Sequence, residues 1–417
     1  MKKVVCVLMI MVMMFGICGC SRTQYEPVAK PVIGDGETYA YEEVELDDEF
    51  KSSTADFALE LFRQTYKNGE NSLVSPVSVL LALGMTANGA NGDTLKEFEE
   101  LLGQELTLNE LNRYYATYKN MLAGTKKDGC TIANSIWVRD WSGLVVKEEF
   151  IKKNTTFYNA EIYKAAFDKS TVYDVNYWVS ENTNGLIREI IKDEINPEIM
   201  MMLINALVFE GEWNKPYYEN SVYDTDFTNI NGEIETVEGM HGTEYSYIED
   251  YNTKGFVKEY KNGYKCVIFL PNEDEDFDEY VASFSGEKYL NLINNISDDN
   301  VITMLPKFKY AYETNLNKTL QDMGLKSAFE PGKADFSGMF EANDQLDKMW
   351  ISDVIHKTYI EMGEKGTKAA AVTAVMVAGN GAPMKDKEVI CDRPFVYAIV
   401  DGETMLPVFI GSVSIIS

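Results

Sequence analysis

The sequence has few of the residues that most enzyme mechanisms need. It contains only two histidines, His241 and His356, and neither lies in the HExxH motif of zinc proteases. The GxSxG elbow of many serine hydrolases, the Walker phosphate loop and a complete GxGxxG motif are also missing. A histidine outside such motifs is more often a hydrogen-bonded structural residue than a catalytic one. The sequence therefore predicts no catalytic residues and a protein that is not an enzyme.

Positive charge is scarce. The chain carries 38 lysines and arginines against 66 aspartates and glutamates, a formal net charge of −28. Such a charge disfavours nucleic acids, anionic membrane surfaces and polyanions such as heparin as partners. Carboxylates are so abundant that a pair of them indicates no particular chemistry. No cofactor and no metal are expected.

Cysteine is also sparse beyond the first twenty residues. Of six cysteines, only Cys130, Cys266 and Cys391 lie in the rest of the chain, and they form no CxxC pair. An odd number of widely spaced cysteines argues against a disulfide framework or a zinc site. Cys266 and Cys391 stand in apolar, strand-like runs, so we expect them to be buried thiols.

No apolar run in the first residues is long enough to span a bilayer comfortably. Two lysines precede the apolar stretch Val4–Ile17, and Ile17-Cys18-Gly19-Cys20 resembles a bacterial lipobox. We expect residues 1–19 to be a lipoprotein signal peptide and Cys20 to carry lipid. The alternative is an ordinary cleaved signal peptide. Residues 20–50 are polar and acidic, which indicates a linker that tethers the domain to the outer side of a bacterial membrane, unless the protein is released extracellularly.

Residues 51–417 are expected to form one mixed helix–sheet domain of the α+β class. Helical spacing begins near Phe50, again after Ser75-Pro76, and near Asp93 up to Gly103. Two further helices are expected over 173–181 and 314–323. Strand-like runs, listed in chain order, are TIANSIWV, KAAFDKS, MLINALVFEGEW, YKCVIFLP, VITMLPKFKY, RPFVYAIV and LPVFIGSVSII.

One stretch, GEKGTKAAAVTAVMVAGNGAP from Gly363 to Pro383, favours neither helix nor strand. Alanine favours helix, valine and threonine favour strand, and glycine breaks both. Alternate residues from Thr367 to Val375 share one face of an extended strand, and Lys368 falls on the other face. The face that begins at Thr367 can therefore be buried without burying a charge.

Several segments, taken together and in order, resemble the serpin family. They are NSLVSPVSVLLALGMTANGANGDT, VNYWVSENTNGLI, LINALVFEGEWNKPY, LPKF, EKGTKAAAVTA, DRPFVYAI and LPVFIGSV. The resemblance covers Phe50 to the C-terminus. It implies three β-sheets, eight or nine helices and an exposed reactive-centre loop over about 364–391.

The resemblance also implies roles for individual residues. Ser75, Ser78, Asn205 and His356 match a polar cluster beneath the point where the main sheet opens. Lys307 and Glu364 match a salt bridge near the top of that sheet, where Trp213 matches a large packed aromatic. The hinge of the loop is matched by Glu364, Gly366, Thr367, Ala369, Ala370, Ala371 and Thr373.

The function implied is suicide inhibition of serine proteases by a monomer. A protease cleaves the loop, forms a covalent acyl complex, and is trapped when the loop inserts into the main sheet. The usual loop length puts the cleaved bond between Asn380 and Gly381, with Met384, Lys385 and Ala378 as alternatives. An elastase-like or chymotrypsin-like target is favoured. The alternative function is a non-inhibitory, lipid-anchored binding protein on the same fold.

Overall fold

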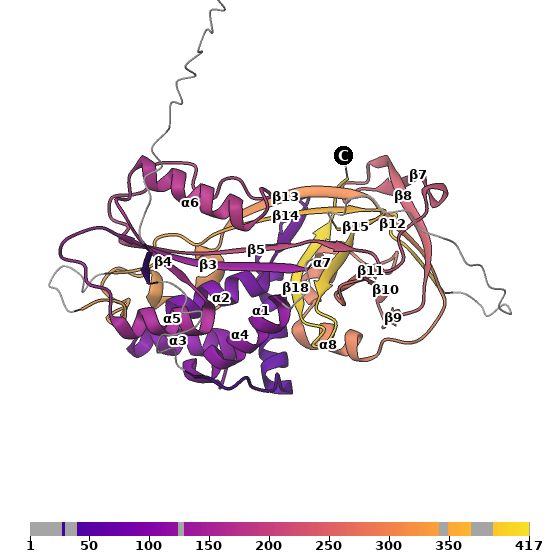
Figure 1. The fold of residues 1–417 in the computed structure, drawn as a ribbon. Helices are drawn as coiled ribbons and strands as arrows, with labels where there is room; N and C mark the ends of the chain where they lie inside the picture. Colours follow the sequence, from indigo (N-terminus) through magenta and orange to yellow (C-terminus); the bar gives the residue numbers. More distant parts are fainter. Residues whose placement is uncertain (1–26, 30–39, 124–128, 342–348, 368–386, 417) are drawn as a thin grey trace, which may run out of the picture.

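The computed structural model describes residues 27–29, 40–123, 129–341, 349–367 and 387–416 (Figure 1). Within these ranges nine α-helices and two short 3₁₀ helices are present. The helices are α1 (Asp48–Thr65), α2 (Pro76–Ala87), α3 (Gly92–Gly103), α4 (Leu108–Ala123), α5 (Glu148–Tyr158), α6 (Lys169–Asn182), α7 (Phe277–Ser283), α8 (Gly286–Asn294), α9 (Asn317–Asp322), η1 (Glu219–Ser221) and η2 (Ser327–Phe329).

The first three helices begin within two residues of where the sequence predicts, and the third ends at the predicted Gly103. The Asp47 side chain caps α1 by accepting from the Phe50 amide at 2.9 Å. Ser75 caps α2, and Pro76 occupies the first helical position, where the missing N–H costs no intrahelical bond. Helix α3 ends at Gly103. Capping side chains and helix breakers thus set these boundaries locally.

The strands form four hydrogen-bonded sheets. In spatial order, the first sheet contains β1 (Pro27–Ala29), β4 (Glu161–Ala165), β3 (Cys130–Arg139) and β5 (Met201–Phe209), and the second contains β13 (Phe308–Asn315), β14 (Ile355–Gly363), β15 (Gly366–Thr367) and β6 (Gly211–Glu212). The third sheet contains β16 (Lys387–Ile390), β12 (Val301–Pro306), β8 (Ile234–Glu244) and β7 (Val222–Thr228). The fourth contains β2 (Ser72–Val74), β18 (Pro407–Val413), β17 (Phe395–Val400), β11 (Lys265–Pro271), β10 (Thr253–Glu259) and β9 (Tyr247–Glu249).

The first two of these sheets are halves of one larger surface. Strand β5 leads into β6 through the single residue Glu210, so the two halves are covalently continuous at that end. Between β5 and β14, however, no ladder is formed by the described residues. Counting the halves together gives the three sheets that the resemblance implies.

Helices cover both faces of the half-sheet that contains β3 and β5. Helix α2 packs against β5 on the side of the large core, together with α1 and α3–α5 (Figure 1). Helix α6 covers the opposite face, where Trp178 and Val179 pack with Trp137 of β3. Because apolar side chains on both faces are buried, this half-sheet is held from two sides.

Three sequence expectations about these elements are wrong in detail. The run KAAFDKS is strand only up to Ala165, because Asp168 accepts from the Ser170 amide and starts α6. The expected helix over 314–323 begins only at Asn317, after β13. The run VITMLPKFKY is two strands in two sheets, separated at Lys307.

The expected linker over 20–50 also overlaps the folded domain. Tyr41 packs on Phe157 of α5, and the Val44 amide donates to Thr117 of α4 at 3.2 Å. Strand β1 pairs with β4. The stretch 40–50 is therefore part of the packed structure rather than a tether.

The three cysteines of the described residues are buried and free, as predicted for Cys266 and Cys391. Burial raises the pKa of the Cys266 thiol to about 12, so it stays protonated and unreactive at neutral pH. Within the ranges that the structure describes, no helix combines the length and apolarity needed to cross a bilayer.

Candidate functional site: the hinge and the opening of the main sheet

The first two residues of the expected loop hinge already lie in the main sheet. Gly366 and Thr367 form β15, which pairs antiparallel with β14 on one side and with β6 on the other. Thr367 is only 3% exposed, and its hydroxyl lies 2.6 Å from the Tyr260 hydroxyl. The parity predicted for Thr367, facing the interior, is confirmed.

Gly366 is required by this arrangement. Its φ of 152° lies in the region that glycine favours, and a Cβ there would collide with the carbonyl oxygen of Gly211 on β6. The hinge can enter the sheet at this point because Gly366 has no Cβ to collide with the Gly211 carbonyl oxygen and the Glu212 backbone.

Trp213 holds the hinge from the side of the large core. Its indole is fully buried and stacks on Tyr260, with ring centroids 4.2 Å apart. Its backbone amide donates to the Lys365 carbonyl at 2.8 Å, and its Nε1–H donates to the Gly363 carbonyl at 2.9 Å. One aromatic residue thus satisfies two carbonyls of the turn that leads into β15.

An ion pair closes the outer side of the same turn. Lys307 Nζ lies 3.1 Å from the Glu364 carboxylate and 3.0 Å from that of Glu238. This is the salt bridge that the resemblance implies. The Lys307 and Glu364 side chains are 26% and 37% exposed, so water screens their attraction.

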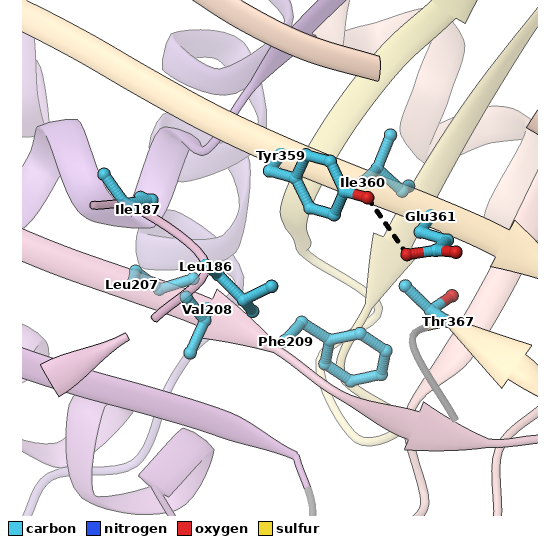
Figure 2. Close-up of a pocket in the computed structure, with 9 residues that line it drawn as sticks. All are labelled: Leu186, Ile187, Leu207, Val208, Phe209, Tyr359, Ile360, Glu361 and Thr367. Atoms are coloured by element: carbon cyan, nitrogen blue, oxygen red, sulfur yellow. Dashed lines mark hydrogen bonds between the residues drawn. The ribbon is translucent and has the colours of Figure 1, made fainter. Parts of the chain in front are cut away.

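Below β15 the two halves of the sheet leave a gap. It is lined by Leu207, Val208 and Phe209 of β5, by Tyr359, Ile360 and Glu361 of β14, and by Leu186, Ile187 and Thr367 (Figure 2). Leu186 and Ile187 come from the segment that follows α6. Thr367 closes its upper end, so a strand that continued from β15 would run into the gap.

Farther down the gap, His356 of β14 meets the start of α2. Its Nε2 accepts from the Ser75 amide at 3.0 Å, and the Ser75 hydroxyl accepts from the Ser78 amide at 3.3 Å. His356 is 6% exposed, and burial lowers its pKa to about 4. It is therefore neutral at pH 7, with its proton on Nδ1, and acts as a structural acceptor.

Asn205 is not part of this hydrogen-bonded group. It lies in the neighbouring half-sheet on β5, where its amide donates to Asn134 Oδ1 of β3 at 2.8 Å. Its own Oδ1 is buried and accepts no hydrogen bond from the described residues. The structure thus joins Ser75, Ser78 and His356, and leaves Asn205 on the other side of the gap.

The loop itself is narrower than the predicted range 364–391. Residues up to Thr367 belong to the sheet, and the chain rejoins the fold at β16, which pairs in parallel with β12. The remaining hinge residues Ala369, Ala370, Ala371 and Thr373, and the candidate cleavage residues Ala378, Asn380, Gly381, Met384 and Lys385, lie outside the described residues. Cys20 does also.

Sequence reasoning missed Tyr260, and it placed Gly211 in a motif without its contact to the hinge. Tyr260 is one of 25 tyrosines, and nothing in its local sequence separates it from the others. Gly211 lies inside a quoted motif, but only the fold reveals that Gly366 approaches its backbone. Both depend on contacts between segments about 100 residues or more apart.

The chain matches the family model Serpin (serine protease inhibitor) over residues 52–415, and it belongs to the serpin family. Serpins mostly inhibit proteases rather than catalyse reactions, and they act on target proteases. An uncharacterized serpin-like protein of Thermococcus kodakarensis is 30% identical, with 85% of this chain and 83% of the relative covered. Leukocyte elastase inhibitor of Xenopus tropicalis is 29% identical, covering 87% and 98%.

Solved structures agree with this assignment. The thermophilic serpin tengpin in its native state has a TM-score of 0.87 and 42% identity, covering 94% of this chain and all of tengpin. Tengpin in its latent state has a TM-score of 0.79 and 43% identity, covering 89% and 99%. Of the two states of tengpin, the native state has the higher TM-score to this chain.

Proposed function

We propose that this chain is a suicide inhibitor of serine proteases that inserts its cleaved loop between β14 and β5. The observation that carries the proposal is β15. Gly366 and Thr367 already pair with both neighbouring strands at the upper end of the gap. Insertion would extend an existing strand, so it needs no new nucleus.

The register of β15 supports this direction of insertion. Met362 of β14 faces Thr367, so the same antiparallel register carried six residues further sets Thr373 opposite His356. On the other side Gly211 faces Thr367, and the same register carried through Glu210 without a shift sets Thr373 opposite Asn205. The Thr373 hydroxyl would then donate to the buried Oδ1 of Asn205, which accepts no hydrogen bond from the described residues.

In the proposed reaction the protease treats the loop as substrate. Its serine oxygen attacks the carbonyl carbon of the cleaved bond, the C–N bond breaks, and the new amine leaves on the segment that leads to β16. The loop residue before the bond is now an ester of the protease serine. Insertion pulls this ester away before water hydrolyses it, so each inhibitor molecule is used once.

An elastase-like or chymotrypsin-like target is part of the proposal. Cleavage between Asn380 and Gly381, or after Met384 or Ala378, offers an uncharged residue to the protease pocket. Lys385 would suit a trypsin-like enzyme instead. The similarity to leukocyte elastase inhibitor supports the first choice.

We also propose that lipid on Cys20 holds the protein at the outer face of a bacterial membrane. The lipobox-like sequence before Cys20 supports this anchor. The proposal also includes that the protein is a monomer, whose partners are a target protease and the lipid bilayer.

The test is incubation of the full chain, solubilised in detergent, with elastase, chymotrypsin and trypsin. An adduct that survives boiling in SDS is expected with at least one of them, and the mass of the released C-terminal peptide identifies the bond. Ala371→Arg shares the inward face with Thr367 and should turn the inhibitor into a substrate. Its matched control, Ala370→Arg on the other face, should still trap the protease.

Cleavage by every protease without an adduct, and without a gain in thermal stability, would contradict inhibition. That result would favour the second candidate, a non-inhibitory binding protein on the same fold. Equal trapping by the two arginine variants would contradict the insertion register but not inhibition itself.

A further inference from the structure

A buried ion pair lies directly beneath the aromatic residues that hold the hinge. Lys258 of β10 and Glu244 at the end of β8 approach to 2.5 Å, and their side chains are 4% and 10% exposed. Burial raises the pKa of Glu244 and lowers that of Lys258, and each is opposed by the partner's charge. Such a pair costs desolvation energy, so it contributes less to stability than its short distance indicates.

The ammonium of this pair also touches both aromatic residues of the hinge. Lys258 Nζ lies 4.2 Å from the ring centroid of Tyr217 and 5.4 Å from that of Trp213. Tyr217 donates its backbone amide to the Glu364 carbonyl at 2.9 Å, while Trp213 donates to Lys365. A single cation thus contacts the two residues whose amides hold Glu364 and Lys365.

The Tyr217 ring has little else to orient it by polar contact. Its buried hydroxyl makes no hydrogen bond of ordinary geometry with the described residues, although the Thr303 hydroxyl lies close enough to interact with it. A cation over the face of a buried aromatic ring is an oriented attraction that strengthens when water is excluded. Glu244 fixes the position of that cation, because it is the carboxylate bonded to it.

We infer that Glu244 and Lys258 are a positioning pair for the reactive-loop hinge, acting through the rings of Tyr217 and Trp213. The carboxylate of Glu244 holds the Lys258 ammonium against the two rings, and the rings hold the backbone of the turn before β15. This inference deepens the proposed function, because it names what governs release of the hinge in a loop-inserting protein.

The Glu244–Lys258 ion pair connects the two ends of the loop. Glu244 pairs with Val301 of β12, and β12 pairs with β16, where the chain returns from the loop. Tyr217 and Trp213 hold the turn by which the chain departs. Movement of β16 would therefore be transmitted to the turn before β15 through one ion pair.

Hydrogen exchange resolved to single amides tests this without any protease. In Glu244→Gln the Trp213 and Tyr217 amides should exchange about tenfold faster than in the wild type, the equivalent of losing one buried cation–π contact. The control is Glu97→Gln in α3. The Glu97 carboxylate accepts from the Lys326 and Ser327 amides, far from the hinge in sequence, so its loss should leave exchange at Trp213 and Tyr217 unchanged.

A second variant separates positioning from stability. The double change Glu244→Gln with Lys258→Met removes both buried charges and should restore the urea midpoint towards the wild-type value. Exchange at the two amides should nevertheless remain fast, because the cation is gone. Unchanged exchange in Glu244→Gln, or full recovery of both measurements in the double variant, would overturn the inference. Failure of protease trapping alone would overturn the proposed function and leave this result standing.

Discussion

Acid should destabilise the native protein through His356. Its Nε2 accepts from the Ser75 amide, so a proton on Nε2 turns the acceptor into a second donor and breaks the bond. The folded-state pKa is about 4 against 6.5 for an unperturbed histidine. The unfolded chain therefore binds more protons between these values, and stability is lost as the pH falls from about 6.5 towards 4.

The size of the loss follows from the two pKa values. Lowering the pH from 7 to 5 should reduce the free energy of unfolding by about 2 kcal/mol through His356, and reaching pH 4 should bring the loss to about 3 kcal/mol. Urea unfolding at pH 7 and pH 5, compared between the wild type and His356→Gln, measures this part. Glutamine offers an oxygen acceptor that does not titrate in this range.

The only other histidine supplies the control. His241 stacks on Tyr223 in β7, away from the gap, and His241→Gln should keep most of the wild-type pH dependence. If His356→Gln loses as much stability as the wild type between pH 7 and 5, the assignment of the acid sensitivity to this hydrogen bond is wrong.

Four further changes have definite expected results. Lys119 is 4% exposed and has no hydrogen-bond partner among the described residues, and burial lowers its pKa to about 8. Lys119→Met should raise the free energy of unfolding at pH 7 by up to about 3 kcal/mol and abolish the gain in stability from pH 8 to 10.5, as measured by urea titration. Gly366→Ala should expel β15 because its Cβ meets Gly211, and the number of inhibitor molecules consumed per trapped protease should rise. Lys307→Met should cost less than about 1 kcal/mol because the pair with Glu364 is partly exposed, with a smaller effect at high salt in thermal unfolding. Cys20→Ser should move the protein from the membrane fraction to the soluble fraction; an unchanged membrane fraction would refute the anchor.

Local signals in the sequence were sufficient for the first helices and most strands. Ser75 caps an amide three residues away and Pro76 lacks only its own N–H, so their effects can be predicted without the fold. The run from Val301 to Tyr310 could not be divided in this way. Pro306 and Lys307 interrupt its apolar pattern, but only the fold reveals that the two halves join different sheets.

The candidate site was predicted through resemblance more than through physics. His356 could be judged structural from the absence of catalytic motifs, but the Ser75 amide that it accepts from is 281 residues away. The Lys258–Glu244 pair had no signal at all, since two charged residues in strands normally face water. Only the packing of β8, β10 and the hinge turn reveals that they are buried.

Strand β1 lies at the far end of the main sheet from the hinge. It pairs with Ile162 and Tyr163 of β4, and the ladders through β3 align this level with Met202 at the start of β5 (Figure 1). Gly211, beside β15, is nine residues along, or about 30 Å at the rise of a strand. In the proposed inhibition the inserted loop would travel towards β1, the segment that follows Cys20. With the proposed lipid anchor on Cys20, a protease caught at the tip would be drawn in towards the bilayer rather than left at the outermost point of the molecule.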